Sequence, residues 1–303
     1  MNILITGGSG FIGRHLSAQL LEEKHKVTIV DQMPTKILGV NYIKGTVMDF
    51  DTLSLALKGQ EVAINLASVV GVQKNEERPA EALDVNIIGT KNVLEACRKN
   101  NVRKIIYSSS SEAYGEPIKI PIEESDSPIP ITTYGIAKLA GEEYIKAYAK
   151  AYGIKYTIFR FFSVYGPDQL TDFVLPRFVA NAIKNEPLII HGDGSQIRAF
   201  CHIDDIIRGI SLSLIRGDNE IINLGNDREV VSMKELAQRI IKLTNSKSEL
   251  QIVPFANTER ARGKEILHRV PALEKAKKLL GYAPSVQLED GLYSVIAHLR
   301  DKK

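Results

Sequence analysis

The first half of the chain alternates short apolar runs with longer stretches in which apolar residues recur at helical spacing. The apolar runs have the length of strands and occupy residues 2–6, 26–31, 41–45, 61–68, 104–110 and 155–164. Amphipathic segments lie between several of these runs, among them Pro79–Asn101 and Tyr134–Tyr152. Strands that are apolar on both faces, each followed by a helix, are typical of a parallel sheet covered by helices on both sides. The pattern therefore predicts a doubly wound α/β fold.

The pattern changes after about Gly166, where the apolar runs become shorter and Pro, Gly and Asp become more frequent. Residues 192–200 have the pattern of a turn that enters a strand, and residues 232–244 have that of a helix. A second helical pattern, over residues 273–282, stops at Gly281, a residue type that suits the position after a helix. These elements predict a smaller mixed α/β lobe, which we expect over the carboxyl edge of the sheet.

The length of the chain agrees with a division into two parts, because 303 residues can form one large domain or two smaller ones. We expect residues 1–165 to form the sheet domain, together with residues 199–224. Residues 166–198 and 225–303 are expected to form the lobe. With 44% hydrophobic and 25% charged residues, the composition is that of an ordinary globular protein.

Charge, hydropathy and cysteine usage argue against several classes of function. The net charge is only +3 and the basic residues are scattered, which disfavours nucleic acid as a partner. No apolar stretch approaches the ~20 residues of a membrane span, and the chain starts directly on a predicted strand, without a signal-peptide pattern. Cys97 and Cys201 have no informative spacing, so we expect buried free thiols and a cytoplasmic protein. His202, Asp204 and Asp205 supply no closed ligand set, so we expect no metal.

The segment TGGSGFIG directly follows the first predicted strand and opens a helix. Its residues Gly7, Gly10 and Gly13 suit a tight turn that brings the backbone close to a pyrophosphate, while the N–H groups of the helix face the anion. The second predicted strand ends in Asp31, 18 residues after Gly13, a spacing that suits a carboxylate bound to the ribose hydroxyls of adenosine. The combination predicts a Rossmann-type dinucleotide site. Because Asp31 would repel a 2′-phosphate, it favours NAD over NADP.

Tyr134 and Lys138, in the segment TTYGIAK, are four residues apart and therefore share one face of a predicted helix. A nearby ammonium group favours the phenolate, so we expect Lys138 to lower the pKa of Tyr134 and make it a base. A solvated pair is the alternative interpretation. The segment YSSSSEAYG, from Tyr107 to Gly115, places a run of hydroxyl groups after a buried strand upstream, which favours the catalytic interpretation.

These motifs occur in an order that resembles the extended short-chain dehydrogenase/reductases, in particular the nucleotide-sugar epimerase and dehydratase group. The layout is most similar to that of the UDP-glucose 4-epimerases. The matching segments span nearly the whole chain and read TGGSGFIG, INLAS, VNIIGTKNVLEA, YSSSSEAYG, YGIAK, RFFSVYGP, GDGSQIRAFCHIDD and LGYAP. The resemblance implies an NAD-dependent isomerase that acts on a UDP-sugar. It also implies a homodimer, since family members commonly pair through helices that correspond to Pro79–Asn101 and Tyr134–Tyr152.

The resemblance implies roles for individual residues as well. In that family the catalytic hydroxyl lies four residues before the tyrosine of a YG pair, and counting back from Tyr114 gives Ser110. Tyr134, as phenolate, removes the proton from a sugar hydroxyl while hydride passes from that carbon to NAD⁺. Ser110 shares the proton through a hydrogen bond. Lys138 holds the ribose of the cofactor.

Further contacts with the cofactor are implied for residues spread over the first half of the chain. They are Phe11, Ile12, Asp49, Leu66, Ala67, Asn86 and Ser108. Two of these have a second interpretation. Asp49 lies close to Thr46, at which family members commonly carry the aspartate that contacts adenine, and it could instead be a helix cap. Asn86 could equally make a local helix or turn bond.

For the substrate, the resemblance places diphosphate-binding arginines at Arg198 and Arg262, a role that suits the planar guanidinium group. Surface charge is the alternative for both. Ser163 replaces the asparagine that the family usually carries before VYGP, so one contact with the substrate phosphate is shortened or absent. Asp168 stands where an arginine often follows YGP, which argues against that route to a sugar carboxylate.

Glu112 bears on the reaction, for which three hypotheses stand: an epimerase, a dehydratase or decarboxylase, and a protein that binds NAD without catalysis. Nucleotide-sugar dehydratases and UDP-glucuronate decarboxylases also carry a carboxylate two residues after the catalytic hydroxyl, and Arg269 resembles an arginine of one decarboxylase branch. Ser111 in place of aspartate weakens the dehydratase hypothesis, and Asp168 weakens decarboxylation. We therefore favour an epimerase in which Ser111, Glu112 and Arg269 lie at the substrate. A non-catalytic NAD-binding protein is the third hypothesis, and it would be expected to lack one of the three proton-handling groups.

Overall fold

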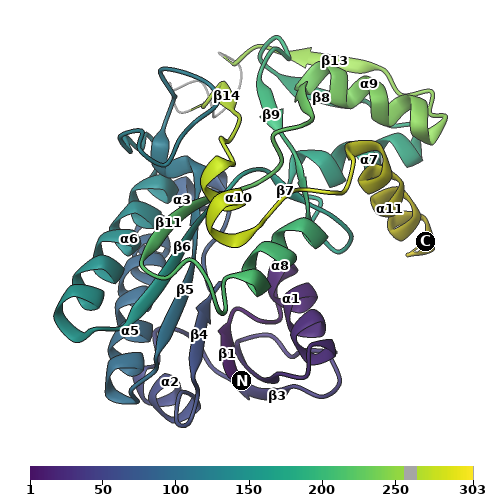
Figure 1. The fold of residues 1–303 in the computed structure, drawn as a ribbon. Helices are drawn as coiled ribbons and strands as arrows, with labels where there is room; N and C mark the ends of the chain where they lie inside the picture. Colours follow the sequence, from purple (N-terminus) through teal and green to yellow (C-terminus); the bar gives the residue numbers. More distant parts are fainter. Residues whose placement is uncertain (256–264, 303) are drawn as a thin grey trace.

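The computed structural model describes residues 1–255 and 265–302. Its main element is a seven-stranded parallel sheet with the order β11-β6-β5-β4-β1-β2-β3 (Figure 1). The strands are β1 (Asn2–Thr6), β2 (Lys26–Asp31), β3 (Asn41–Lys44), β4 (Val62–Asn65), β5 (Lys104–Ser110), β6 (Lys155–Phe161) and β11 (Glu220–Leu224). The predicted doubly wound fold is thus confirmed. The order reverses between β1 and β4, and in open α/β sheets ligands bind at the carboxyl ends of such a pair.

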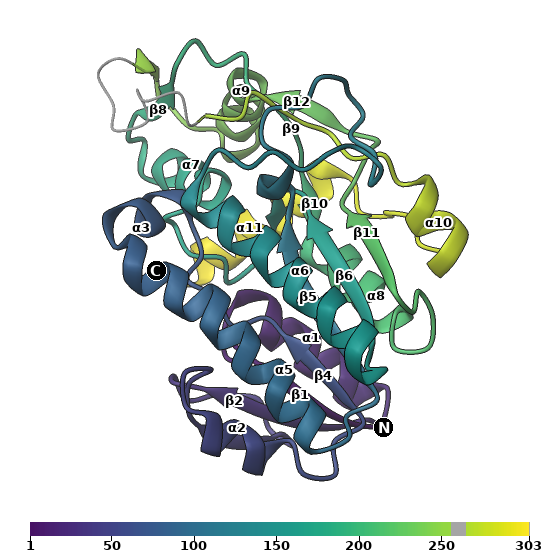
Figure 2. The same ribbon diagram turned by 90° about the vertical axis from the view of Figure 1, so that its left-hand side faces the viewer.

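Helices cover both faces of the sheet, as its apolar strands require. One face is covered by α1 (Phe11–Glu22), α8 (Ile203–Leu212) and α10 (Glu274–Leu280). The other face is covered by α2 (Phe50–Ala56), α5 (Gly89–Lys99) and α6 (Thr133–Tyr152), and Figure 2 shows α5 and α6 side by side. Alternate residues of β1 enter the two cores, Ile3 and Ile5 the first and Leu4 the second. None of the described helices is long and apolar enough to cross a membrane.

Residues 79–101, predicted as one helix, form three helical segments. α4 (Pro79–Leu83) is followed by a π-helical turn, η1 (Asp84–Ile88), and then by α5. A short helix, α3 (Val72–Glu77), precedes them. The π-helical turn contains Asn86, whose side chain is hydrogen-bonded to the backbone of Val69. The spacing of apolar residues predicts the helix but carries no sign of this interruption, which depends on a contact with another segment.

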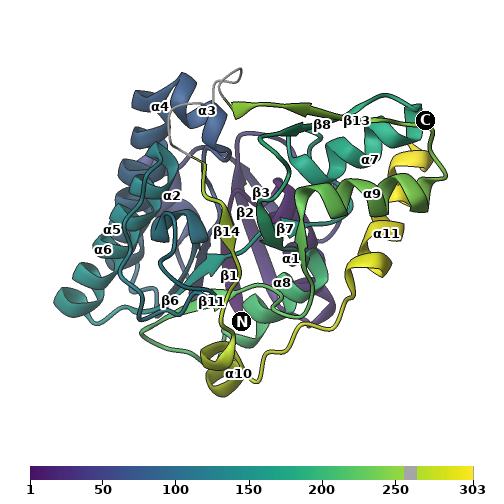
Figure 3. The same cartoon turned by 90° about the horizontal axis from the view of Figure 1, so that it is seen from above.

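A smaller lobe lies over the carboxyl edge of the sheet (Figures 1 and 3). Its helices are α7 (Val174–Lys184), α9 (Met233–Thr244) and α11 (Leu288–Asp301). Its strands are β8 (Leu188–His191), β9 (Ile197–Ala199), β12 (Val230–Ser232), β13 (Leu250–Val253) and β14 (His268–Arg269). The strands β7 (Val164–Tyr165) and β10 (Cys201–His202) pair with each other between the two parts, where Val164 and Cys201 pack in the core of the sheet and Tyr165 in that of the lobe. β9 pairs antiparallel with β12 and parallel with β14, so the lobe has the predicted mixed character.

The segment around α10 differs from the predicted division of the chain, which assigns it to the lobe. Leu273, Ala276, Leu280 and Tyr282 are buried in the same core as α1 and α8, against the sheet. The apolar spacing of this segment correctly predicts a helix that ends before Gly281. Spacing alone does not tell which of two apolar surfaces such a helix covers.

Candidate active site

The turn between β1 and α1 requires glycine at two positions. Gly7 has a φ angle of 71°, and a Cβ atom there would lie 2.8 Å from the backbone nitrogen of Ala67. A Cβ atom on Gly13 would lie 2.4 Å from the carbonyl oxygen of Gly7. The helix α1 begins directly after Gly10, which has no side chain to cap the N–H groups of the first turn. Backbone donors at a helix start beside a narrow turn are suited to a pyrophosphate, so these residues fit a dinucleotide.

Asp31 lies at the end of β2, next to this turn. Its Oδ2 atom accepts a hydrogen bond from the backbone nitrogen of Ser9 at 3.0 Å, and its Oδ1 atom accepts one from Met33 at 2.9 Å. The carboxylate is therefore fixed against the glycine-rich turn, as a residue that binds the adenosine ribose would need to be. Phe11 and Ile12 form the start of α1 and are partly buried against the core.

The loop after β4 lies beside the same turn. The strand predicted to reach residue 68 ends at Asn65, and Leu66 and Ala67 follow it out of the sheet. Asn86 accepts hydrogen bonds from the hydroxyl of Ser68 at 2.8 Å and from the backbone nitrogen of Val69 at 2.9 Å. These contacts are made with another segment and not within the helix or a turn, and a contact of Asn86 with the cofactor stays a prediction. They hold the loop in place beside the glycine-rich turn.

Asp49 is the N-cap of α2. Its side chain accepts hydrogen bonds from the backbone nitrogen of Thr52 at 3.0 Å and from the Thr52 hydroxyl at 2.6 Å. The hydrogen bonds with Thr52 also lower the pKa of the Asp49 carboxyl group. This is the helix-cap role that is the alternative interpretation of Asp49, and a contact with adenine stays a prediction.

Two of the four consecutive serines are bound to other parts of the core. The hydroxyl of Ser108 donates to the carbonyl oxygen of Asn65 at 3.0 Å. The hydroxyl of Ser109 donates to Glu142, a fully buried carboxylate of α6. Since both hydroxyls are buried and already donate to protein groups, they are poor candidates for proton transfer to a ligand.

Ser110 is placed differently, at the end of β5 and the edge of the sheet. It is half-buried and forms the N-cap of a 3₁₀ turn, η2 (Ser111–Tyr114), where its Oγ atom accepts the backbone N–H of Glu112 at 3.2 Å. Its hydroxyl hydrogen is not used by that bond. Ser111 and Glu112 are buried within the turn. Among these hydroxyls, Ser110 is the one suited to share a proton with a substrate.

The first turn of α6 packs directly on η2. Thr132, the N-cap of α6, accepts the N–H of Gly135 at 3.0 Å and donates to Oε2 of Glu112 at 3.1 Å. A Cβ atom on Gly135 would lie 2.5 Å from the carbonyl oxygen of Glu112. Because only glycine allows this approach, the sequence YG in TTYGIAK brings Tyr134 to the turn that carries Ser110.

Tyr134 and Lys138 lie on one face of α6, as predicted. The Nζ atom of Lys138 is 5.5 Å from the centroid of the Tyr134 ring and 5.0 Å from that of Tyr107. Burial and the charge of Glu112 raise the pKa of Tyr134, and a hydrogen bond with Ser68 lowers it only in part. The prediction that Lys138 lowers the pKa of Tyr134 is therefore wrong: in the protein without a bound cofactor, this pKa is raised. The reason is burial, which also lowers the pKa of Lys138 to about 7 and so weakens it as a source of positive charge.

Glu112 and Arg269 meet beside this group although 157 residues separate them in the sequence. The Nη2 atom of Arg269 lies 2.5 Å from Oε1 of Glu112. The Nε atom of Arg269 is buried and has no hydrogen-bond partner among the described residues. β14, which carries Arg269, reaches this position by pairing with β9 of the lobe. The structure thus brings together both residues that distinguish the hypotheses about the reaction.

Of the two arginines predicted to bind the diphosphate, the structure describes Arg198. Arg198, in β9, donates to Glu265 at 2.8 Å and to the carbonyl oxygens of Ile266 and Leu267 at 2.7 and 2.9 Å. Its guanidinium group therefore joins two segments of the lobe, and a role at the diphosphate stays a prediction. Arg262 lies outside the described residues.

Two of the positions at which the sequence departs from the family pattern, Ser163 and Asp168, have distinct surroundings. Ser163 has a φ angle of 35°, in the left-handed region that asparagine tolerates better than serine. The carboxylate of Asp168 lies 3.4 Å from Arg14 of α1 and 3.0 Å from Lys302, directly after α11. Asp168 therefore links the sheet domain to the lobe.

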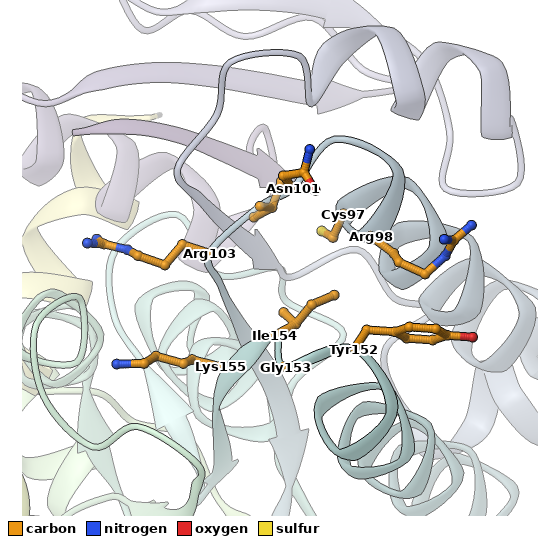
Figure 4. Close-up of a pocket in the computed structure, with 9 residues that line it drawn as sticks. Cys97, Arg98, Asn101, Arg103, Tyr152, Gly153, Ile154 and Lys155 are labelled. Carbon is orange, nitrogen blue, oxygen red and sulfur yellow. The ribbon is translucent and has the colours of Figure 1, made fainter.

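A cavity of about 370 Å³ lies at the opposite edge of the sheet, where α5 and α6 lead into β5 and β6 (Figure 4). Three cations line it, but Figure 4 shows Arg98 pointing one way and Arg103 and Lys155 the other. Arg98 is bound to Glu95, and Lys155 lies 2.7 Å from an aspartate. Cations that diverge and have partners do not form an anion site, so we assign no function to this cavity.

Sequence reasoning missed three polar residues of the candidate active site. Ser68 lies close enough to Tyr134 to lower its pKa, Thr132 donates to Glu112, and Glu142 is one helical turn beyond Lys138. A signal existed for Glu142, which follows Tyr134 and Lys138 at the same spacing of four residues. Thr132 could be predicted as a helix cap but not as a partner of Glu112. Ser68 has no local signal, since its contact is made across the sheet edge.

The chain belongs to the NAD dependent epimerase/dehydratase family, whose family model matches residues 3–225. NAD is the cofactor of this family, as the glycine-rich turn and Asp31 predict. The chain is 34% identical over 309 residues to a putative UDP-glucose 4-epimerase of Methanocaldococcus jannaschii, covering 99% of this chain and 98% of the relative.

Two other comparisons extend this result. The chain is 34% identical over 316 residues to a UDP-N-acetyl-alpha-D-glucosaminuronate decarboxylase of Bacillus cytotoxicus, covering 98% of this chain and 97% of the relative. The fold matches the crystal structure of UDP-glucose 4-epimerase with UDP-glucose from Thermotoga maritima, with a TM-score of 0.93 and 32% identity. That match covers 100% of this chain and 99% of the other. Relatives with different reactions are thus similar over the same length.

Proposed function

We propose that this chain is a UDP-sugar 4-epimerase. It oxidises the C4 hydroxyl of the sugar with NAD and then reduces the resulting keto-sugar on its other face. The observation that carries the proposal is the contact between η2 and the first turn of α6, which brings Ser110 and Tyr134 together beside the glycine-rich turn, with Lys138 one helical turn away. The similarity to UDP-glucose 4-epimerases over the whole chain supports it.

In this reaction Tyr134 accepts the proton of the C4 hydroxyl, and Ser110 holds that hydroxyl by a hydrogen bond. When bound, NAD⁺ supplies the hydride acceptor and a positive charge. Lys138 lies against the ring of Tyr134 and holds the ribose of the cofactor. The same groups return the proton after the sugar has turned, so no second substrate is needed.

The test is to incubate the purified protein separately with UDP-glucose, UDP-galactose, their N-acetyl forms and UDP-glucuronate. Products are followed by chromatography and mass spectrometry. An unchanged mass with a new retention time is the expected result. Loss of water or of carbon dioxide would contradict epimerisation. Absence of any conversion would favour a protein that only binds NAD.

Decarboxylation of a UDP-hexuronate is the second candidate, and the Glu112–Arg269 pair is the observation that favours it. Oxidation at C4 turns a uronate into a β-keto acid, which loses carbon dioxide readily, and an acid beside the ring can then protonate C5. A relative of the chain is a decarboxylase of this kind. We rank it second because position 168, from which an arginine would bind a sugar carboxylate, carries a carboxylate that is already bound to Arg14.

The two candidates predict different effects for Glu112→Gln, which keeps the size of the side chain but removes its charge. In an epimerase Glu112 moves no proton, so turnover should fall less than about tenfold, or ~1.4 kcal/mol of barrier. In a decarboxylase the loss should reach about 10²–10⁴-fold, the usual contribution of general acid–base catalysis. Steady-state kinetics decide between them, with the exposed residue Glu123 changed to glutamine as the control. A large loss together with trapped NADH would contradict the epimerase.

We also propose a homodimer that forms through α5 and α6. These helices lie side by side over one face of the sheet (Figure 2), and Ile88 and Ile136 on this layer are 39% and 50% exposed. Burying such a layer against a second copy would form a four-helix bundle. Light scattering at micromolar concentration should therefore give twice the mass of the chain. Replacing Ile136 with lysine should lower that mass toward the monomer, and a wild-type monomer would contradict the proposal.

A further inference from the structure

We propose that Glu142 is a positioning residue, which fixes the catalytic helix α6 against β5 and gives Lys138 its counter-charge. This inference rests on the proposed function, since it acts through Lys138 and Tyr134. Glu142 itself touches neither the expected substrate nor the expected cofactor. It follows Lys138 by four residues and therefore lies one helical turn further along the same face of α6.

A row of polar residues crosses the sheet beneath this helix. Ser109 of β5 is paired in register with Arg160 of β6, and Arg160 is paired with Asn223 of β11. Neighbouring residues in register project on the same face of a parallel sheet. All three are buried, in strands whose other residues are mainly apolar. A buried polar row of this kind needs partners, because unpaired polar groups in a core are costly.

Glu142 supplies the partners of Ser109 and Arg160, whereas Asn223 is bound to Tyr114. Its Oε1 atom accepts hydrogen bonds from Ser109 and from Nε of Arg160 at 3.0 Å, and its Oε2 atom accepts from Nη2 of Arg160 at 2.7 Å. The two charged side chains are 0% and 3% exposed. α6 is thereby bound to β5 and β6 at the level of Lys138.

A buried ion pair of this kind is not explained by stability alone. Two apolar side chains of similar volume are often as stabilising or more so, because removing two charges from water is expensive. Such pairs do fix one arrangement of the elements that carry them, and here those elements are α6 and β6. The hydrogen bond from Ser109 to Glu142 also joins α6 to β5, the strand that ends in Ser110. The geometry therefore points to a role in placing Tyr134 and Ser110.

Lys138 is a second charged group on which Glu142 acts, in addition to its direct partner Arg160. The titratable groups that face Lys138 are Tyr134 and Glu142 from α6 itself and Tyr107 from β5. Burial lowers the pKa of Lys138 to about 7, and the charge of Glu142 opposes this effect. Without that carboxylate the lysine would lose its proton at a lower pH, and a neutral lysine would hold the cofactor ribose less well.

The same network reaches the turn that carries the other proton-handling group. The guanidinium carbon of Arg160 lies 4.4 Å from the centroid of the Tyr114 ring, and the Tyr114 hydroxyl donates to Asn223 at 2.7 Å. Tyr114 is the last residue of η2, which begins next to Ser110. The pair of Glu142 and Arg160 thus contacts both the helix of Tyr134 and the turn of Ser110.

The test is to titrate wild-type protein and the variant Glu142→Gln with NAD at several pH values between 6 and 9. The affinity of the wild type should fall as the pH rises through the pKa of Lys138. In the variant the fall should come about one pH unit earlier, so that at pH 8 the affinity is about tenfold weaker and recovers toward pH 6. The control is Glu143→Gln, whose side chain is 61% exposed and bound only to Lys146 among the described residues, and which should match the wild type.

Two further variants make the result decisive. In a Lys138→Met background, Glu142→Gln should have no additional effect on affinity. Glu142→Asp keeps the charge but cannot span Ser109 and Arg160, so its pH midpoint should stay in place while kcat falls, and this variant serves if the glutamine variant does not fold. An unshifted midpoint in Glu142→Gln, or an equal loss of affinity at every pH, would overturn the proposal. Because the pH midpoint of NAD binding is the deciding readout, failure of the epimerase assignment would leave the NAD titrations of all these variants unaffected; only the kcat of Glu142→Asp depends on it.

Discussion

Replacing Tyr134 with phenylalanine is expected to lower turnover by at least ~10²-fold while the variant still folds and binds NAD. The change removes one oxygen atom, which is the group proposed to take the proton of the sugar hydroxyl. The aromatic ring remains, so its contact with Lys138 at 5.5 Å is kept. Turnover of the UDP-sugar should therefore fall while the affinity for NAD stays unchanged. Steady-state kinetics measure the first quantity and a direct NAD titration the second.

The matched control is Tyr152→Phe at the other end of the same helix. Tyr152 is 54% exposed and lies in contact with Arg98, far from the carboxyl edge of the sheet. Its variant should turn over substrate like the wild type. Turnover of Tyr134→Phe within a few-fold of the wild type would show that another group takes the proton.

NADP is expected to bind at least about 10²-fold more weakly than NAD. The carboxylate of Asp31 is fixed by the backbone of Ser9 and Met33, so it cannot move away from a 2′-phosphate. Two unit charges about 4 Å apart near a protein surface repel each other by about 4 kcal/mol, which is more than a factor of a hundred. Fluorescence or calorimetric titration with both cofactors measures the ratio.

Asp31→Asn should reduce the preference for NAD over NADP, mainly by lowering the affinity for NAD, since the amide is a poorer acceptor for two ribose hydroxyls. Asp51→Asn removes one exposed charge from the nearby helix α2 and should leave the ratio unchanged. Equal affinity of the wild type for the two cofactors would contradict the role proposed for Asp31.

Local sequence patterns predict the strands of the main sheet and the glycine-rich turn, because burial or backbone geometry restricts the residue types at these positions. The apolar runs predict six of the seven strands of the main sheet to within a few residues, because strands buried on both faces leave little room for polar positions. The seventh, β11, is not among the predicted runs. The glycine-rich turn was predictable for a similar reason. Its geometry excludes any Cβ atom at Gly7 and Gly13, so the residue type itself carries the information.

Local patterns do not predict contacts between segments that lie far apart along the chain. The pair of Glu112 and Arg269 depends on β14 joining β9, and a two-residue strand has no recognisable pattern. The pKa of Tyr134 was predicted in the wrong direction because the spacing to Lys138 is visible in the sequence whereas burial is not. Arg198 was predicted from its neighbours in the motif, but its contacts with Glu265 come from another segment.

The most direct test of the proposed reaction follows one hydrogen atom. A UDP-hexose that carries deuterium at C4 is incubated with the protein in ordinary water, and the product is analysed by mass spectrometry and NMR. Because hydride leaves C4 and returns to C4 of the same sugar, we predict the C4 epimer with unchanged mass and with deuterium retained at C4. The companion reaction, unlabelled UDP-glucuronate in deuterated water, should give no product that has lost carbon dioxide. A decarboxylated or dehydrated sugar with solvent deuterium at C5, or an epimer that has lost its C4 label, would contradict the proposed epimerase.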